Sequence, residues 1–126
     1  MEKFNEEFRA WLEESLSDGV PSSVAAFAFN LSEKSSDDAR YAVEFVGASE
    51  FDPHDPDWAC AEVWEPSNGR NFAIPSSFCD GDWEACLDKM KGLVASLLNE
   101  PSQLSTKLRS VNGLGIGFVD GELILI

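Results

Sequence analysis

The carboxyl-terminal stretch Leu114-Gly-Ile-Gly-Phe-Val-Asp-Gly-Glu-Leu-Ile-Leu-Ile126 decides the expected fold. Within it, Asp120-Gly121 is a preferred centre for a two-residue type I′ turn, so the apolar residues on either side are predicted to form a tight antiparallel hairpin. The last four residues, 123–126, are all apolar, and an exposed strand of that composition would aggregate. We therefore expect the final strand to be central in a sheet or well covered.

Two glycines leave the first strand of this hairpin with one bare face. Gly115 and Gly117 alternate with Leu114, Ile116 and Phe118. A strand face without side chains lets a helix or an aromatic ring approach the backbone closely. The same Gly-x-Gly pattern precedes a hairpin and not a helix, which excludes a phosphate-binding loop.

Further strands are expected where apolar residues alternate with small or polar ones. Residues 24–31 and 40–48 follow this pattern, and the longer polar segment 32–38 between them predicts an antiparallel hairpin. Shorter strands are expected at 59–64 and at 72–74.

Apolar residues recur at helical spacing in two long segments and one short segment. The first long helix is predicted at residues 3–16. The second follows the natural N-cap Asp82, and its apolar stripe runs from Trp83 to Leu97. A shorter helix is expected between Pro101 and the Asn-Gly pair that follows Val111.

One α+β domain over residues 1–126 accounts for these elements. The expected architecture is an antiparallel sheet of about four to six strands, with the two longer helices packed against one face and a C-terminal β-hairpin. A chain of 126 residues with 44% apolar residues is large enough for one core. Because no apolar run approaches the about 18 residues of a membrane span and no export signal is recognisable, a cytoplasmic location is expected.

The net charge of −14, from 9 Lys and Arg against 23 Asp and Glu, is the strongest feature of the composition. This charge would repel phosphate backbones and anionic lipids, which disfavours direct binding to nucleic acid or to a membrane. A basic protein is the partner that the charge favours. The alternative is that the acidity serves only to keep the protein soluble.

The acidity is concentrated in the segment Phe51-Asp-Pro-His-Asp-Pro-Asp-Trp-Ala-Cys-Ala-Glu-Val-Trp64. It belongs to a longer run, residues 41–69, that contains no lysine or arginine. Its two prolines exclude a helix interior or a central strand, so residues 52–57 are predicted to form a loop, and Asp57 is expected to cap a short turn or strand that begins at Trp58.

Carboxylates next to tryptophans are typical of one half of an electrostatically steered interface. The carboxylates attract a basic partner from a distance, and the aromatic rings supply buried contact area once the partner has arrived. We expect Trp58 or Trp64 to be the anchor, although core packing is the alternative role for at least one of them. The predicted contact residues are Asp52, Asp55, Asp57, Trp58, Glu62, Trp64 and Glu65.

Metal binding is disfavoured by the spacing of the candidate ligands. His54, Cys60, Cys79 and Cys86 make four candidate zinc ligands, but none of them form the close pairs that structural zinc sites use. The three aspartates of the 52–57 loop suit calcium in type, but the loop has two prolines and lacks the required glycine. Three cysteines without a Cys-x-x-Cys pair suit a reducing compartment.

No catalytic apparatus is recognisable, so a non-enzymatic protein without a cofactor is expected. The single histidine, His54, lies in the predicted loop, and no serine sits in a Gly-x-Ser-x-Gly elbow. An acidic protein always contains carboxylates that could pair for acid–base chemistry. A small enzyme or metal-binding protein therefore stays as an alternative.

Residues 51–64, together with the terminal motif Gly-Ile-Gly-Phe-Val-Asp-Gly-Glu-Leu, resemble small acidic bacterial immunity-type proteins of polymorphic and contact-dependent toxin systems. The resemblance implies a cytoplasmic, non-enzymatic protein that neutralises a toxin domain, and it supplies no functional residues. Nuclease toxins are basic because they bind phosphates, so an acidic inhibitor can occupy the same surface. The alternative is a cytoplasmic adaptor or regulatory protein with another partner.

Overall fold

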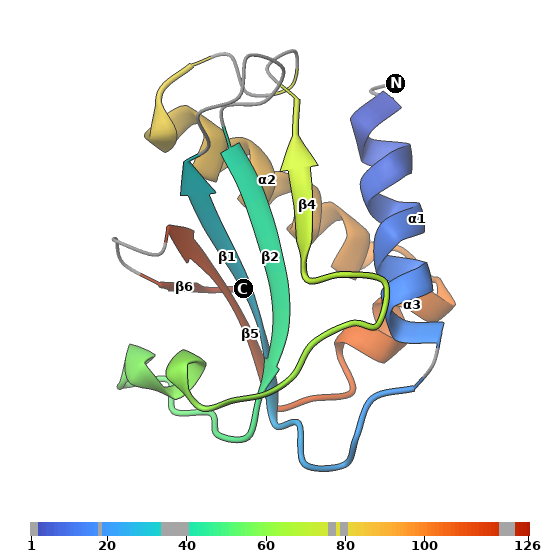
Figure 1. The fold of residues 1–126 in the computed structure, drawn as a ribbon, viewed down its shortest axis with the longest axis vertical. Coiled ribbons are helices and arrows are strands. Elements are labelled where there is room, and N and C mark those ends of the chain that lie inside the picture. Colours follow the sequence, from blue (N-terminus) through green and yellow to red (C-terminus); the bar gives the residue numbers. More distant parts are fainter. Residues whose placement is uncertain (1–2, 18, 34–40, 76–77, 79–80, 119–122) are drawn as a thin grey trace.

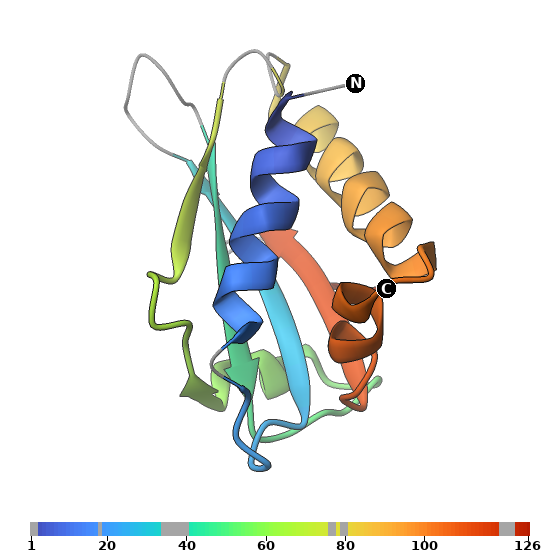
Figure 2. The same cartoon turned by 90° about the vertical axis from the view of Figure 1, so that its right-hand side faces the viewer.

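The computed structural model describes residues 3–17, 19–33, 41–75, 78, 81–118 and 123–126, and its architecture is α+β (Figure 1). A mixed sheet forms one layer, and the helices form a second layer against one of its faces (Figure 2). The elements found among the described residues are α1 (Lys3–Ser17), β1 (Ala26–Glu33), β2 (Tyr41–Ala48), the 3₁₀ helix η1 (Pro56–Cys60), β3 (Glu62–Trp64), β4 (Asn71–Ile74), α2 (Trp83–Asn99), α3 (Gln103–Leu108), β5 (Gly113–Phe118) and β6 (Ile124–Leu125).

The sheet is built around the hairpin of β1 and β2, which are antiparallel as predicted. Two short strands, β3 and β4, pair in antiparallel fashion with the two ends of β2. On its other side β1 pairs with β5, and these two strands are parallel. The sheet is therefore mixed, where a purely antiparallel one was expected, because α2 and α3 return the chain in a crossover before β5 begins.

The C-terminal hairpin is present, but its second strand does not lie where the sequence suggested. β5 and β6 pair in antiparallel fashion, with Ile116 opposite Ile124, and the predicted turn at Asp120-Gly121 falls outside the described residues. The strand order β3-β2-β1-β5-β6 makes β6 an outer strand and not a central one. Two residues form β6, and a very short edge strand limits aggregation without needing a cover.

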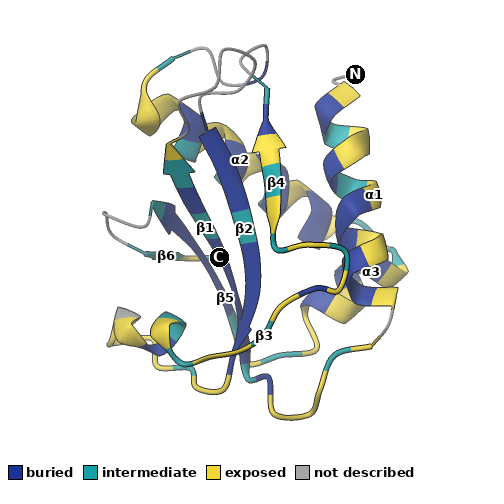
Figure 3. Ribbon diagram, in the orientation of Figure 1, coloured by how far each residue is buried: buried dark blue, intermediate teal, exposed yellow. Residues whose placement is uncertain are grey.

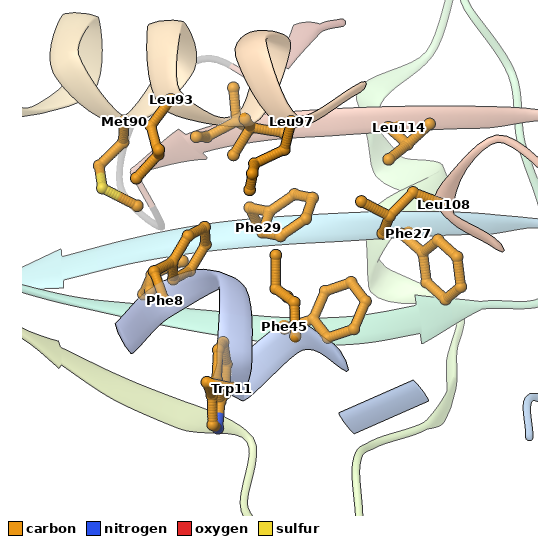
Figure 4. Close-up of a cluster of buried hydrophobic side chains, with 14 of the residues drawn as sticks. Phe8, Trp11, Phe27, Phe29, Phe45, Met90, Leu93, Leu97, Leu108 and Leu114 are labelled. Atoms are coloured by element: carbon orange, nitrogen blue, oxygen red, sulfur yellow. The ribbon is translucent and has the colours of Figure 1, made fainter. Parts of the chain in front are cut away.

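The main core fills the space between the sheet and the helices (Figure 4). Its centre is aromatic: the Phe45 ring of β2 lies 5.0 Å from Phe27 and 4.9 Å from Phe29, measured between ring centroids. α1 adds Phe8 and Trp11 to this layer, which confirms the helical stripe predicted for it. Offset and tilted rings at these separations contribute about 0.5–1.5 kcal/mol per pair beyond the area that they bury.

The start of α2 follows the prediction in its cap but not in its first side chain. The Asp82 carboxylate accepts a hydrogen bond from the Ala85 N–H at 3.0 Å. Trp83, expected on the buried stripe, keeps 48% of its surface exposed, and the stripe instead begins at Cys86. Trp83 is the first helical residue, and its ring contacts Phe118 at the border of the core, with centroids 5.9 Å apart.

The connection between β3 and β4, residues 65–70, contacts both layers of the protein. On the helix side, the Ser15 hydroxyl of α1 donates to the carbonyl of Trp11 at 2.7 Å and lies 3.1 Å from Asn68 Oδ1. On the sheet side, the Phe45 N–H donates to the carbonyl of Arg70 at 2.9 Å. The connection is therefore bonded both to α1 and to β2.

Within the described part of the chain, no helix has the combination of length and apolar character that crossing a membrane requires. The longest, α2, has 17 residues and carries Glu84, Asp88, Lys89 and Lys91. Its polar side faces outward, as is usual for a helix laid on a core.

Replacing Asp82 by alanine is expected to lower the free energy of unfolding by about 1 kcal/mol, because the Ala85 N–H then loses its partner. Asp82→Asn keeps a side-chain oxygen acceptor and serves as the matched control, with little loss expected. Urea unfolding followed by circular dichroism measures both. Equal losses in the two variants would contradict a capping role.

Candidate protein-binding surface

The acidic segment, defined here as residues 51–65, places η1 on the sheet face opposite α1, α2 and α3 (lower left in Figure 1). It contains all seven predicted contact residues and includes η1 and β3. Figure 3 shows the region around η1 as largely exposed. The segment packs against this face of the sheet.

Small side chains make that sheet face flat. Strand alternation places Ala26 and Ala28 of β1 next to Val46 and Ala48 of β2, and all four are fully buried. Together with Trp58 they form a second, smaller core. A face built from alanine and glycine leaves room for large rings from the covering segment.

Phe51 and Trp58 fill this room, and their rings meet edge to face with centroids 5.3 Å apart. The fit depends on glycine in β5: a Cβ added to Gly113 would lie 2.2 Å from the Phe51 ring. A Cβ added to Gly115 would lie 3.1 Å from the Trp58 ring and 3.0 Å from Leu123. The prediction that an aromatic ring approaches the bare face of this strand is therefore confirmed.

This packing joins the two motifs that carried the family resemblance. Residues 51–64 supply the rings, and the Gly-x-Gly strand that opens the terminal motif supplies the floor beneath them. The two motifs lie far apart in the sequence, yet their described residues pack against each other.

The aspartates of the loop fix its backbone while staying exposed. The Asp55 carboxylate accepts from the Asp57 N–H at 3.0 Å and caps η1, and the Asp52 carboxylate accepts from the His54 N–H at 2.9 Å. The prediction that Asp57 is the cap is wrong by two residues. Proline favours the first position of a helix, so the residue before Pro56 becomes the cap.

The glutamates gather around a single cation. Arg70 forms ion pairs with Glu44 at 3.2 Å, with Glu65 at 3.0 Å and with Glu62. The hydrogen bond to Glu44 is the main reason why the pKa of the Arg70 guanidinium is raised above its ordinary value. A raised pKa means that the Arg70 guanidinium is charged at neutral pH, and the stability that this charge contributes is lost as the pH rises into strong alkali. Three carboxylates against one guanidinium leave the group with a net charge of −2.

Neither predicted anchor offers a free indole face. Trp58 is only 3% exposed and belongs to the smaller core. Trp64 is half-buried on the other face, where its ring lies 5.9 Å from Phe27 and 5.7 Å from Phe45. The predicted carboxylates thus form two groups along the acidic segment, the loop aspartates and the glutamates at Arg70, and the two tryptophans occupy supporting positions. Trp83 is the tryptophan that stands exposed, and its place at the first turn of a helix was the available signal.

Among the residues that the structure describes, no three histidine, cysteine or acidic side chains are grouped so that they could hold a metal ion. Cys60 lies on the surface and Cys86 in the main core, on opposite faces of the sheet. Cys79 falls outside the described residues.

Comparison of this chain with known protein families, with curated proteins and with solved structures finds no match. The function is therefore inferred from the surface of the acidic segment. That surface presents exposed carboxylates on a backbone that local hydrogen bonds and two buried rings hold in place.

Substituting Gly113 by alanine is expected to lower the free energy of unfolding by about 2–3 kcal/mol, because the added methyl group collides with the Phe51 ring. Combined with Phe51→Ala, the loss should be clearly smaller than the sum of the single losses, since the methyl group then has room. Gly92→Ala is the control: nothing lies within 4 Å of the added Cβ, and a gain of about 0.5–1 kcal/mol is expected for the exposed helix position. Additive losses in urea unfolding would contradict the contact.

Arg70→Met is expected to destabilise the protein by about 1–2 kcal/mol, because three neighbouring carboxylates lose their common partner. Adding Glu44→Gln should recover part of this loss by removing one of the repelling charges. The exposed Lys107→Met variant makes the same change of charge elsewhere and should be nearly neutral. Thermal unfolding compares the stability of the three variants. Equal destabilisation by Arg70→Met and Lys107→Met would contradict a stabilising role for the Arg70 ion pairs.

Proposed function

We propose that this chain is an acidic protein-binding module, acting as an immunity protein that neutralises a basic toxin domain, such as a nuclease, by covering it. The single observation that supports this most is the acidic segment, in which exposed carboxylates occupy fixed positions on the sheet. In this proposal the protein works in the cytoplasm, without a cofactor and without catalysis of its own.

Electrostatics supports the choice of partner. Residues 41–69 hold seven carboxylates and no lysine or arginine, and the next cation, Arg70, is already shared by three of those carboxylates. A surface of one sign raises the rate at which a partner of opposite sign arrives. The surface therefore suits a basic protein and repels nucleic acid.

Preorganisation supports a binding role over a role in solubility alone. The rings of Phe51 and Trp58 fasten the segment to the sheet, and Asp52 and Asp55 fix the backbone of the loop. Carboxylates held in this way lose little conformational freedom when a partner binds. Charge that serves only solubility needs no such positions, whereas a complementary surface does.

The test uses the triple variant Asp52→Asn, Asp55→Asn and Asp57→Asn with the toxin encoded beside this gene. Asparagine keeps the oxygen acceptors of both caps, so the fold should be retained while three charges are lost. The affinity for the toxin should fall about tenfold, mainly through slower association, and its salt dependence should become weaker. Surface plasmon resonance at several salt concentrations measures both quantities.

The control is the triple variant Glu6→Gln, Glu7→Gln and Glu14→Gln, which removes the same charge from exposed positions of α1. It should leave affinity close to that of the unaltered protein. Equal binding by both triple variants would show that the acidic segment is not the contact surface. If the neighbouring gene encodes no toxin and no basic protein copurifies, the immunity role is lost, and the adaptor alternative takes its place.

A further inference from the structure

The outer strand β6 lies between two regions that carry exposed acids. On the face of the acidic segment, Leu123 and the Trp58 ring both approach Gly115. On the helix face, Ile124 and Phe118 line a groove of about 430 Å³ together with the start of α2. In Figure 1, η1, β6 and the amino-terminal end of α2 all lie toward the left side of the molecule.

The outward edge of β6 has backbone groups that can pair with another strand. The Ile126 N–H donates to the carbonyl of Leu114 at 3.0 Å, and Ile124 lies opposite Ile116. In an antiparallel pair, the backbone groups of successive residues alternate between facing the partner strand and facing away from it. The N–H and carbonyl of Leu125 therefore point away from β5, toward the open edge of the sheet. The Leu125 side chain is itself 42% exposed.

The groove beside this edge combines an exposed ring with acidic borders. Trp83 is 48% exposed and forms one wall with Phe118. Glu84 and Asp88 border the groove, together with one cation, Lys91. On the opposite face, Trp58 lies against Gly115 next to Leu123, and the exposed Asp55 and Asp57 precede Trp58 in the chain. A strand placed next to β6 would therefore have carboxylates above and below it.

We propose that the β6 edge and the Trp83 groove bind an extended, lysine- or arginine-rich segment of a protein partner. The segment adds a strand beside β6, sets an apolar side chain on Trp83 and directs its basic side chains toward the acids on both faces. A second copy of this chain is disfavoured as the occupant, because it also carries a net charge of −14. This inference goes beyond the proposed function, since it does not require the partner to be a toxin.

The test uses a seven-residue synthetic peptide in which lysine and valine alternate. The peptide is titrated into ¹⁵N-labelled full-length protein, and binding is followed by NMR. Shifts are expected at the amides of residues 123–126 and at the indole N–H of Trp83. A peptide with N-methyl groups on alternate residues keeps the charge but loses the strand donors, and it should bind at least tenfold more weakly. Equal binding of both peptides would overturn strand addition.

Two variants locate the site. Trp83→Ala and Leu125→Pro should each weaken peptide binding at least fivefold, the first by removing the ring and the second by removing the outward N–H. Val63→Ala is the control, because Val63 is a comparably exposed apolar residue, 49% exposed, on the outer strand β3. Shifts confined to residues 52–65, unchanged binding by both variants, or dimer formation through β6 in light scattering would each overturn the proposal. The toxin is absent from this assay, so failure here leaves the neutralisation proposal standing.

Discussion

The contact of two aromatic rings with the glycines of β5 is the constraint on which the far face of this protein depends. Phe51 can occupy its place only because residue 113 is glycine, and a side chain at residue 115 would crowd Trp58 and Leu123. That contact positions η1, and η1 in turn positions the carboxylates around it. A single steric requirement thus connects the fold of the carboxyl-terminal hairpin with the presentation of negative charge elsewhere.

The two faces of the sheet have different side chains and different roles. One face carries large aromatic and aliphatic side chains and packs against the helices, where most of the hydrophobic stabilisation is generated. The other carries alanine and glycine and holds a thin cover whose outer surface is acidic. Strand alternation makes this division possible within β1 and β2, because neighbouring residues belong to different cores.

Local periodicity was sufficient to predict α1, α2, the first hairpin and the C-terminal hairpin, because each depends on residues close in sequence. Local periodicity could not predict the parallel pairing of β5 with β1, because the crossover through α2 and α3 determines the direction of β5. The sequence left open which of Trp58 and Trp64 is buried, and it placed Trp83 on the buried stripe, for a related reason. Trp58 is buried against Gly115, which is distant in the sequence, whereas Trp83 stays exposed because it begins a helix. The carboxylates were easier to place, because prolines and charge keep such a segment at the surface.

The 65–70 connection has a consequence for how the protein opens. Asn68 is bonded to α1, while Arg70 holds glutamates from two strands and from the connection itself on the far face. Breaking the Arg70 cluster would release the cover of the smaller core and loosen the helix layer together. The amides of the two layers should therefore exchange with deuterium as one cooperative unit, although a sheet separates them.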